Sequence, residues 1–117
     1  MARFQITRMS DVPPVTCPCG QARRAFTDAG DGVASLHVVD ITADARTHYH
    51  RRHTELYYVL EGEGLIELDG EVHPLRAGDA VLIEPGCRHR AICPPGGTLR
   101  VLNVPVPSFD PADEWFD

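Results

Sequence analysis

The sequence contains no lysine, because all eleven of its basic residues are arginines. This absence excludes Schiff-base chemistry and a lysine general base. Any anionic ligand must therefore be held by guanidinium groups or backbone amides. Seventeen acidic residues outnumber the basic ones and give a formal net charge of −6. Nucleic acids and anionic membrane surfaces attract basic patches, so we expect neither as a partner.

Long apolar runs are also missing. No stretch approaches the roughly 20 apolar residues of a membrane span, and residues 1–20 lack the hydrophobic segment of a signal peptide. We therefore expect a cytoplasmic protein with reduced cysteines at positions 17, 19, 87 and 93. Cys17 and Cys19 have no second pair of cysteines at metal-binding spacing, which makes them a weak metal site.

Helical periodicity is nearly absent, and short apolar runs bounded by Gly, Pro and Asp take its place. This pattern is typical of an all-β sandwich or barrel. The Asp69-Gly70 pair favours a tight hairpin turn between two strands. The predicted strands are Ser35–Ile41, Arg46–His50, Glu55–Glu61, Leu65–Leu68, Glu71–Leu75, Ala80–Ile83, Arg88–Cys93 and Leu99–Val104.

The length of 117 residues suits one domain with one modest core. Residues 1–30 are polar and irregular, which predicts an N-terminal arm. Residues 31–104 hold the predicted strands and form the barrel. Residues 105–117 are rich in proline and form a C-terminal tail, whose two terminal aromatic residues, Trp115 and Phe116, we expect to dock rather than stay in water.

The segment from His48 to Glu55 carries the clearest chemical signal. Side chains two apart on a strand point to the same face, so His48 and His50 can reach one point inside a barrel. A short turn then allows Glu55 to face the same point from the next strand. His89 lies near the start of a later strand and can enter the same interior. These four residues predict a site for one divalent metal ion, with Fe, Mn, Ni, Zn and Cu all compatible.

Two motifs around these residues resemble those of the cupin superfamily. His48-x-His50-x4-Glu55-x6-Gly62 matches the first cupin motif, and Gly78-x7-Gly86-x2-His89 resembles the second. The resemblance implies a double-stranded β-helix (jelly-roll) barrel, a metal ion on the three histidines and the glutamate, and often a homodimer. The superfamily includes dioxygenases, isomerases, decarboxylases, lyases and non-catalytic binders, and a fold does not choose among them.

Arg46 and Tyr57 are the candidate substrate-binding residues. Arg46 shares its strand face with His48, and its guanidinium could clamp an anionic group or pair with an internal acid. Tyr57 shares a face with Glu55 and could donate a hydrogen bond or simply pack. His53 lies in the turn between the ligands, where it could be an alternative ligand or an acid/base group at the mouth, although we expect it to be solvated. His37 is expected to be structural or exposed.

Four protein ligands leave two positions open on a six-coordinate ion, for substrate oxygens or for substrate and O₂. The first hypothesis is a metal-dependent enzyme acting on a small oxygen-rich molecule, with a dioxygenase slightly favoured. The alternatives are a non-redox isomerase, epimerase or lyase and a small-molecule binding module without turnover. For assembly, the apolar residues in the two arms predict a homodimer.

Overall fold

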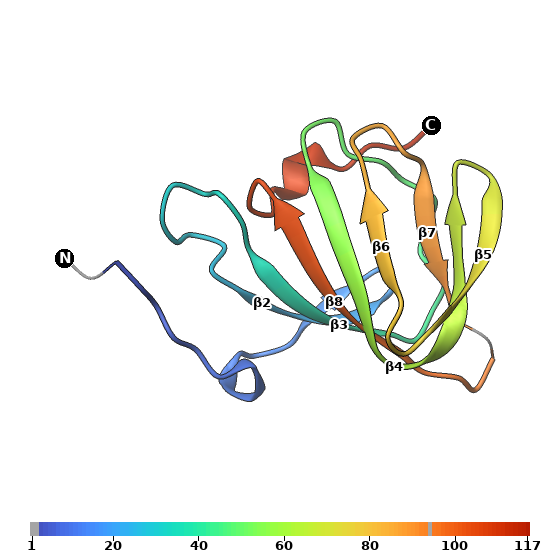
Figure 1. Cartoon of the computed structure of the whole chain (residues 1–117), viewed down its shortest axis with the longest axis horizontal. Helices are drawn as coiled ribbons and strands as arrows, with labels where there is room; N and C mark the ends of the chain where they lie inside the picture. Colours follow the sequence, from blue (N-terminus) through green and yellow to red (C-terminus); the bar gives the residue numbers. More distant parts are fainter. Residues whose placement is uncertain (1–2, 94) are drawn as a thin grey trace.

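The computed structural model describes residues 3–93 and 95–117, which form eight strands and two short 3-10 helices. Figure 1 shows the strands curled into a barrel that is open at the end where the C-terminal tail lies. The predicted all-β barrel is confirmed. The elements are η1 (Met9–Asp11), β1 (Val15–Cys17), β2 (Gly20–Ala25), β3 (Leu36–Ile41), β4 (Thr54–Leu68), β5 (Glu71–Arg76), β6 (Ala80–Ile83), β7 (His89–Ile92), β8 (Leu99–Val106) and η2 (Pro111–Asp113).

Strand β4 belongs to both walls of the barrel. Its first half pairs with β6 and β8, and its second half pairs with β5 and β7. The register with β8 shifts between Val59 and Glu61, and Gly62 follows with a φ of +87°. A Cβ at Gly62 would lie 1.9 Å from the carbonyl oxygen of Thr98, so only glycine fits. The two strands predicted over 55–61 and 65–68 are thus one continuous, bent strand.

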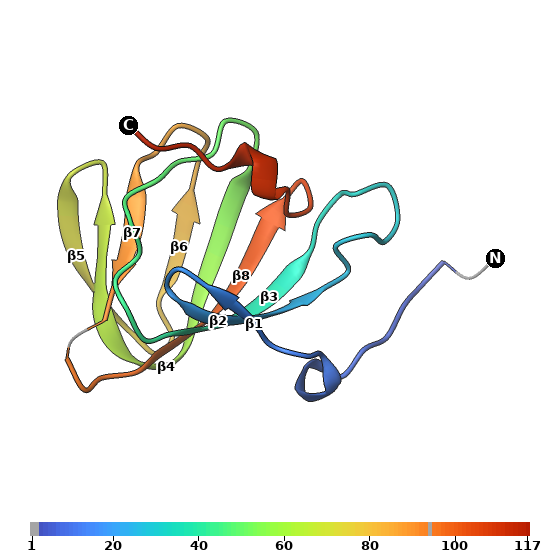
Figure 2. The same cartoon turned by 180° about the vertical axis from the view of Figure 1, so that it is seen from behind.

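The N-terminal region differs from the predicted irregular arm. β1 and β2 form a hairpin, and β2 pairs with β3 over its full length, from Gly20 opposite Ile41 to Ala25 opposite Leu36. Half of the positions of β2 hold polar residues, and its two buried residues, Ala22 and Ala25, are three apart, so the strand shows no apolar alternation. Residues 3–8 do lie apart from the barrel, as Figures 1 and 2 show.

The core fills the closed half of the barrel. Ala22, Val39, Val101 and Val59 are register partners on β2, β3, β8 and β4, and all four are buried. Each buried valine contributes roughly 1.5–3 kcal/mol relative to an exposed one. This apolar row forms a floor, above which the interior opens toward the tail.

The structure tests one predicted turn and one predicted strand directly. Asp69 and Gly70 have φ angles of +47° and +84°, which confirms the tight turn between β4 and β5. The strand predicted over 46–50 was wrong, because only His48 and Tyr49 form single bridges, to His89 and Trp115. Among the described residues, no helix has the length and apolar character needed to cross a membrane.

Candidate metal centre

The segment that connects β3 to β4 brings the first two histidines beside the third. His48 and His89 exchange two backbone hydrogen bonds of 3.1 and 2.9 Å, and the carbonyl of His50 accepts from the amide of Gly86 at 2.8 Å. These bonds pin the connecting segment to the start of β7, while Glu55 enters from the start of β4. Two-residue spacing then places His48 and His50 on one side of the segment, as predicted.

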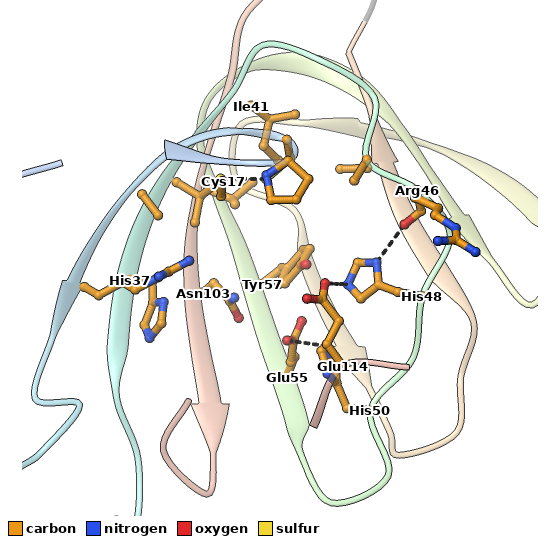
Figure 3. A pocket seen from close by; sticks show the side chains of 18 of the residues that line it. Cys17, His37, Ile41, Arg46, His48, His50, Glu55, Tyr57, Asn103 and Glu114 are labelled. Atoms are coloured by element: carbon orange, nitrogen blue, oxygen red, sulfur yellow. Dashed lines mark hydrogen bonds and ion pairs between the residues drawn. The ribbon is translucent and has the colours of Figure 1, made fainter. Parts of the chain in front are cut away.

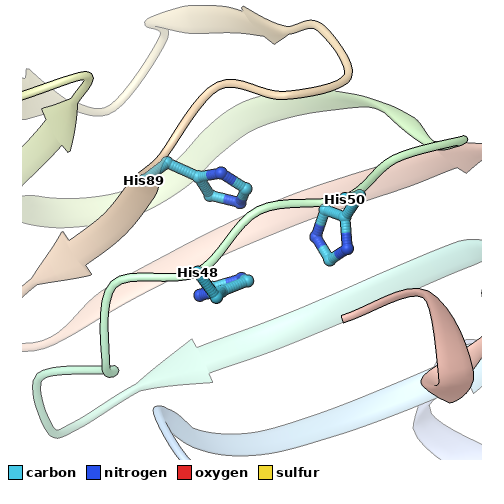
Figure 4. Close-up of side chains that lie close together, drawn as sticks. All are labelled: His48, His50 and His89. Atoms are coloured by element: carbon cyan, nitrogen blue, oxygen red, sulfur yellow. The ribbon is translucent and has the colours of Figure 1, made fainter. Parts of the chain in front are cut away.

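The structure brings the four predicted ligands together at the mouth of the barrel. One ring nitrogen from each of His48, His50 and His89 lies within 4.8 Å of the others, and Figure 4 shows the three rings gathered around one space. The Glu55 carboxylate reaches the same space, with oxygens 2.9 Å from Nε2 of His50 and 3.6 Å from Nε2 of His89. Such a set of nitrogen and oxygen donors suits a first-row divalent ion.

Backbone carbonyls determine which nitrogen of each ring faces this space. Nδ1 of His48, His50 and His89 donates to the carbonyls of Arg46, Asp113 and Cys87, at 2.9, 2.6 and 2.9 Å. A carbonyl can only accept a hydrogen bond, so each Nδ1 carries a proton and Nε2 of the neutral ring offers a lone pair. Metal-binding histidines are oriented in this way by the atoms around them.

The four residues leave polar atoms that the protein does not satisfy. Nε2 of His50, Nε2 of His89 and one oxygen of Glu55 are buried without a hydrogen-bond partner. Leaving such atoms unpaired costs roughly 1–3 kcal/mol each. A cation at this point would contact all of them, so the residues present fit a bound metal ion.

The charges of the site favour an ionised carboxylate. Burial raises the pKa of Glu55, but the imidazoles of His50 and His89 outweigh burial and hold that pKa below its usual range. Burial and the neighbouring His89 lower the pKa of His48. For His50, burial lowers the pKa, but the adjacent Glu55 carboxylate outweighs it and raises the pKa overall.

The C-terminal tail supports the site from outside. The Asp113 carboxylate accepts hydrogen bonds from the backbone amides of residues 51, 52 and 53, at 3.0, 2.9 and 3.1 Å, and from the indole of Trp115 at 3.1 Å. Burial raises the pKa of Asp113, but these bonds outweigh it and lower the pKa to about 2. His50, His53 and Asp113 also form a buried group with donor atoms close together. The oxygens of Asp113 are already engaged, which makes this group a structural support.

Arg46 and Tyr57 lie at different depths. Arg46 is exposed, and its guanidinium stacks on the ring of Phe116, 4.3 Å from the centroid. No internal acid pairs with it among the described residues. Tyr57 lines the interior, where burial and the Glu55 carboxylate raise its pKa well above the ordinary value and keep the phenol protonated.

Of two further histidines, His53 is placed differently from the prediction, and His37 takes the structural one of its two expected roles. His53 was expected to be solvated, but its side chain is only 2% exposed because the tail covers the turn that carries it. His37 is buried too, and it faces the interior. Neither position could be inferred from the local sequence, since both depend on which distant segment covers them.

A cavity of about 330 Å³ opens from the metal centre into the barrel. In Figure 3, His37 and Asn103 lie on one side of it and His48 and Arg46 on the other, with Tyr57 and Glu55 between them. Sequence reasoning missed several lining residues. The alternation of β8, with Leu99, Val101 and Asn103 on one face, was the available signal for Asn103. The missed residues are Arg24, Asn103, Glu114 and Phe116.

Cys17 and Cys19 also line the cavity, with their sulfur atoms 3.1 Å apart. The hydrogen bond from Cys19 lowers the pKa of Cys17 to about 6. The same hydrogen bond, together with burial, raises the pKa of Cys19. Cys17 is therefore the more acidic of the two thiols at the turn between β1 and β2.

Comparisons with known proteins agree on one family. The cupin domain model matches residues 29–105. The L-ectoine synthase of Mycolicibacterium vanbaalenii is 39% identical over 93 residues, covering 74% of this chain and 70% of the relative. A crystal structure of a protein from Planctomyces limnophilus is 44% identical, with a TM-score of 0.89 and 98% of each chain covered.

More distant structures share the fold. Pac13 of Streptomyces, described as a nucleoside dehydratase, is 19% identical, with a TM-score of 0.77, 97% of this chain covered and 89% of that chain. Ectoine synthase from P. lautus is 24% identical, also with a TM-score of 0.77, covering 93% of this chain and 82% of that chain.

Proposed function

The chain belongs to the cupin family, and from that premise we propose that it is a metal-dependent enzyme with a non-redox reaction of the lyase or isomerase type. The observation that carries the proposal is the convergence of His48, His50, His89 and Glu55 at the mouth of a cavity lined with further polar groups. The substrate is a small molecule bearing oxygen, of a size suited to about 330 Å³.

The choice of a non-redox reaction over a dioxygenase is supported by the relatives. The curated relative with 39% identity is named as a synthase, L-ectoine synthase, and not as an oxygenase. The fold alone is neutral between the two. The dioxygenase hypothesis has no support in these comparisons.

The residues of this chain would divide the work as follows. His48, His50, His89 and Glu55 hold the metal, which acts as a Lewis acid toward a substrate oxygen when bound. Tyr57 stays protonated and donates a hydrogen bond inside the cavity. Glu114 lies at the mouth, with its carboxylate 3.9 Å from Nε2 of His48, where it can accept a hydrogen bond from a substrate hydroxyl.

Metal analysis of anaerobically purified protein tests this proposal. We expect one transition-metal ion per chain in the wild type and none in the double variant His48→Ala, His50→Ala. His73→Ala is the matched control, because His73 is an exposed histidine with its side chain 53% accessible, and it should keep the metal. Stoichiometric metal in the double variant would contradict the site.

Oxygen uptake separates the reaction classes. We expect no O₂ consumption when the metal-loaded protein meets a panel of small hydroxy and keto acids, and we expect turnover that persists without O₂. Iron in the protein together with substrate-dependent O₂ uptake would favour the dioxygenase instead. Saturable binding without turnover would favour a binding module.

We also propose a homodimer, on the basis of apolar residues that one chain leaves in water. Phe4 and Ile6 are 73% and 89% exposed in the arm that stands away from the barrel (Figure 1). Leu56, Tyr58 and Leu82 are exposed on the outer face of β4 and β6. Light scattering at micromolar concentration should give about twice the chain mass of 12.9 kDa. A mass equal to one chain would refute the dimer.

A further inference from the structure

Four polar side chains form a line across the inner wall of the barrel. Arg24 on β2 is the register partner of His37 on β3, which pairs with Asn103 on β8, which pairs with Tyr57 on β4. Register partners lie on the same face of a sheet, and all four line the cavity. We call these residues the polar row. It lies directly above the apolar row that forms the floor.

Arg24 provides a positive charge that the protein does not neutralise. Its Nε is buried without a hydrogen-bond partner, and no carboxylate of the described residues forms an ion pair with it. The guanidinium stacks on the ring of Phe109, 4.4 Å from the centroid, which holds its plane in place. A guanidinium held in this way presents donors suited to a planar anion.

Asn103 presents a second unsatisfied group beside Arg24. Its side-chain oxygen is buried without a hydrogen-bond partner. An amide oxygen can only accept a hydrogen bond, so the bond that Asn103 lacks would come from a ligand donor such as a hydroxyl. Two neighbouring polar groups without partners, facing one cavity, indicate a place where a ligand supplies the missing bonds.

His37 sets the total charge of the polar row. Its Nε2 lies 2.8 Å from Oγ of Ser35, and its ring meets Phe109 edge-on. Burial and the adjacent Arg24 lower the pKa of His37 to about 4, so the ring is neutral at neutral pH. The polar row therefore carries a single positive charge, which matches a carboxylate. A phosphate dianion would leave one charge uncompensated.

From this geometry we infer that Arg24 binds the carboxylate of a small substrate whose other end reaches the candidate metal centre, and that the side-chain oxygen of Asn103 accepts a hydrogen bond from a hydroxyl of the same substrate. The inference rests on the proposed function and adds its substrate class, a small monocarboxylate with an oxygen substituent. The cavity is also lined by Ala91 and, at the floor, by Val39 and Val101, which suits a short aliphatic body. Arg24 determines specificity here, while Arg46 lies outside, at the mouth.

Titration of full-length protein with propionate, lactate and inorganic phosphate tests the inference. Carboxylates also bind metals directly, so each titration is done on metal-loaded protein and on protein stripped with a chelator. We expect Arg24→Gln to weaken propionate and lactate binding about ten- to hundredfold in both forms, because a charge-assisted hydrogen bond is lost. Metal content should stay at the wild-type value.

Arg23→Gln is the matched control. Arg23 is the preceding residue of β2, and its guanidinium donates to the carbonyls of Ser10 and Val12, outside the cavity. This variant should bind carboxylates like the wild type. Equal carboxylate affinity in Arg24→Gln and wild type would overturn the inference, and so would tighter binding of phosphate than of propionate by the metal-free wild type.

Two further measurements cover the cases in which Arg24→Gln fails to fold or the wild type contains no metal. If Arg24→Gln fails to fold, Arg24→Lys keeps the charge but loses the planar fork. It should bind carboxylates about threefold more weakly, and wild-type affinity in that variant would overturn the inference. Absence of metal from the wild type would refute the proposed function, while titration of the metal-free protein would still decide the role of Arg24.

Discussion

The two ends of the cavity are assembled in different ways. One end holds the candidate metal centre, and we call it the metal end. There, His48, His50 and Glu55 come from one short stretch of chain, and His89 joins them through two backbone hydrogen bonds to His48. The polar row takes each of its four residues from a different strand. The residues of the metal end can therefore be recognised from their spacing in the sequence. The polar row cannot, because strand order and register bring its residues side by side.

The difference extends to how each end is supported. The metal end depends on backbone carbonyls that orient its imidazoles, and one of these carbonyls belongs to Asp113 in the tail. The polar row depends on Phe109, which stacks on Arg24 and meets His37 edge-on. Both ends thus rely on the segment that follows β8, although neither motif includes it.

The largest effect is expected at Asp113, and it would show how far the metal end depends on the tail. Asp113→Ala leaves three backbone amides and one indole without their acceptor, so we expect the free energy of unfolding to fall by about 3 kcal/mol. Urea unfolding measures this loss. Metal affinity should fall as well, since the turn and the carbonyl that orients His50 both shift.

Asp110→Ala is the control for this prediction. Asp110 caps η2 through the amide of Ala112 and pairs with Arg52 at the surface, so the loss should be about 1 kcal/mol, with metal affinity unchanged. Equal stability and metal affinity of Asp113→Ala and wild type would mean that the metal end is held by its local segment alone.

A smaller effect is expected from His37 on the pH dependence of the free energy of unfolding, and it tests whether the polar row carries a single positive charge. The folded protein keeps His37 neutral down to about pH 4, whereas the unfolded chain takes up this proton near pH 6.5. As the pH falls between these values, the proton stabilises the unfolded state, so by pH 4.5 His37 lowers the free energy of unfolding by about 2–3 kcal/mol. His37→Asn should remove that part of the pH dependence.

Urea unfolding at pH 7 and pH 4.5 measures the difference, with His73→Asn as a matched substitution at an exposed histidine. The His73 variant should keep the wild-type slope. A wild-type slope in His37→Asn would show that His37 is not held neutral, and the polar row would then carry a different charge.

Much of the fold could be predicted because its signals are local. The Asp69-Gly70 turn and the strands over residues 36–41, 71–76 and 80–83 followed from alternation and turn residues. The hairpin of β1 and β2 could not be predicted in this way, because β2 shows no apolar alternation and its pairing partner β3 comes later in the chain. The strand expected over 46–50 failed for a related reason, since only two of its residues find partners.

The sequence by itself determined the all-β class and the types of donor atom gathered at the candidate metal centre, because two-residue alternation and short turns act over a few positions. Only the tertiary structure decided that Arg24, His37 and Asn103 share one wall and that Asp113 supports His50 from the tail. Both arrangements depend on strand order, register and long-range burial, which arise from the packing of the whole barrel and leave no pattern in any short segment.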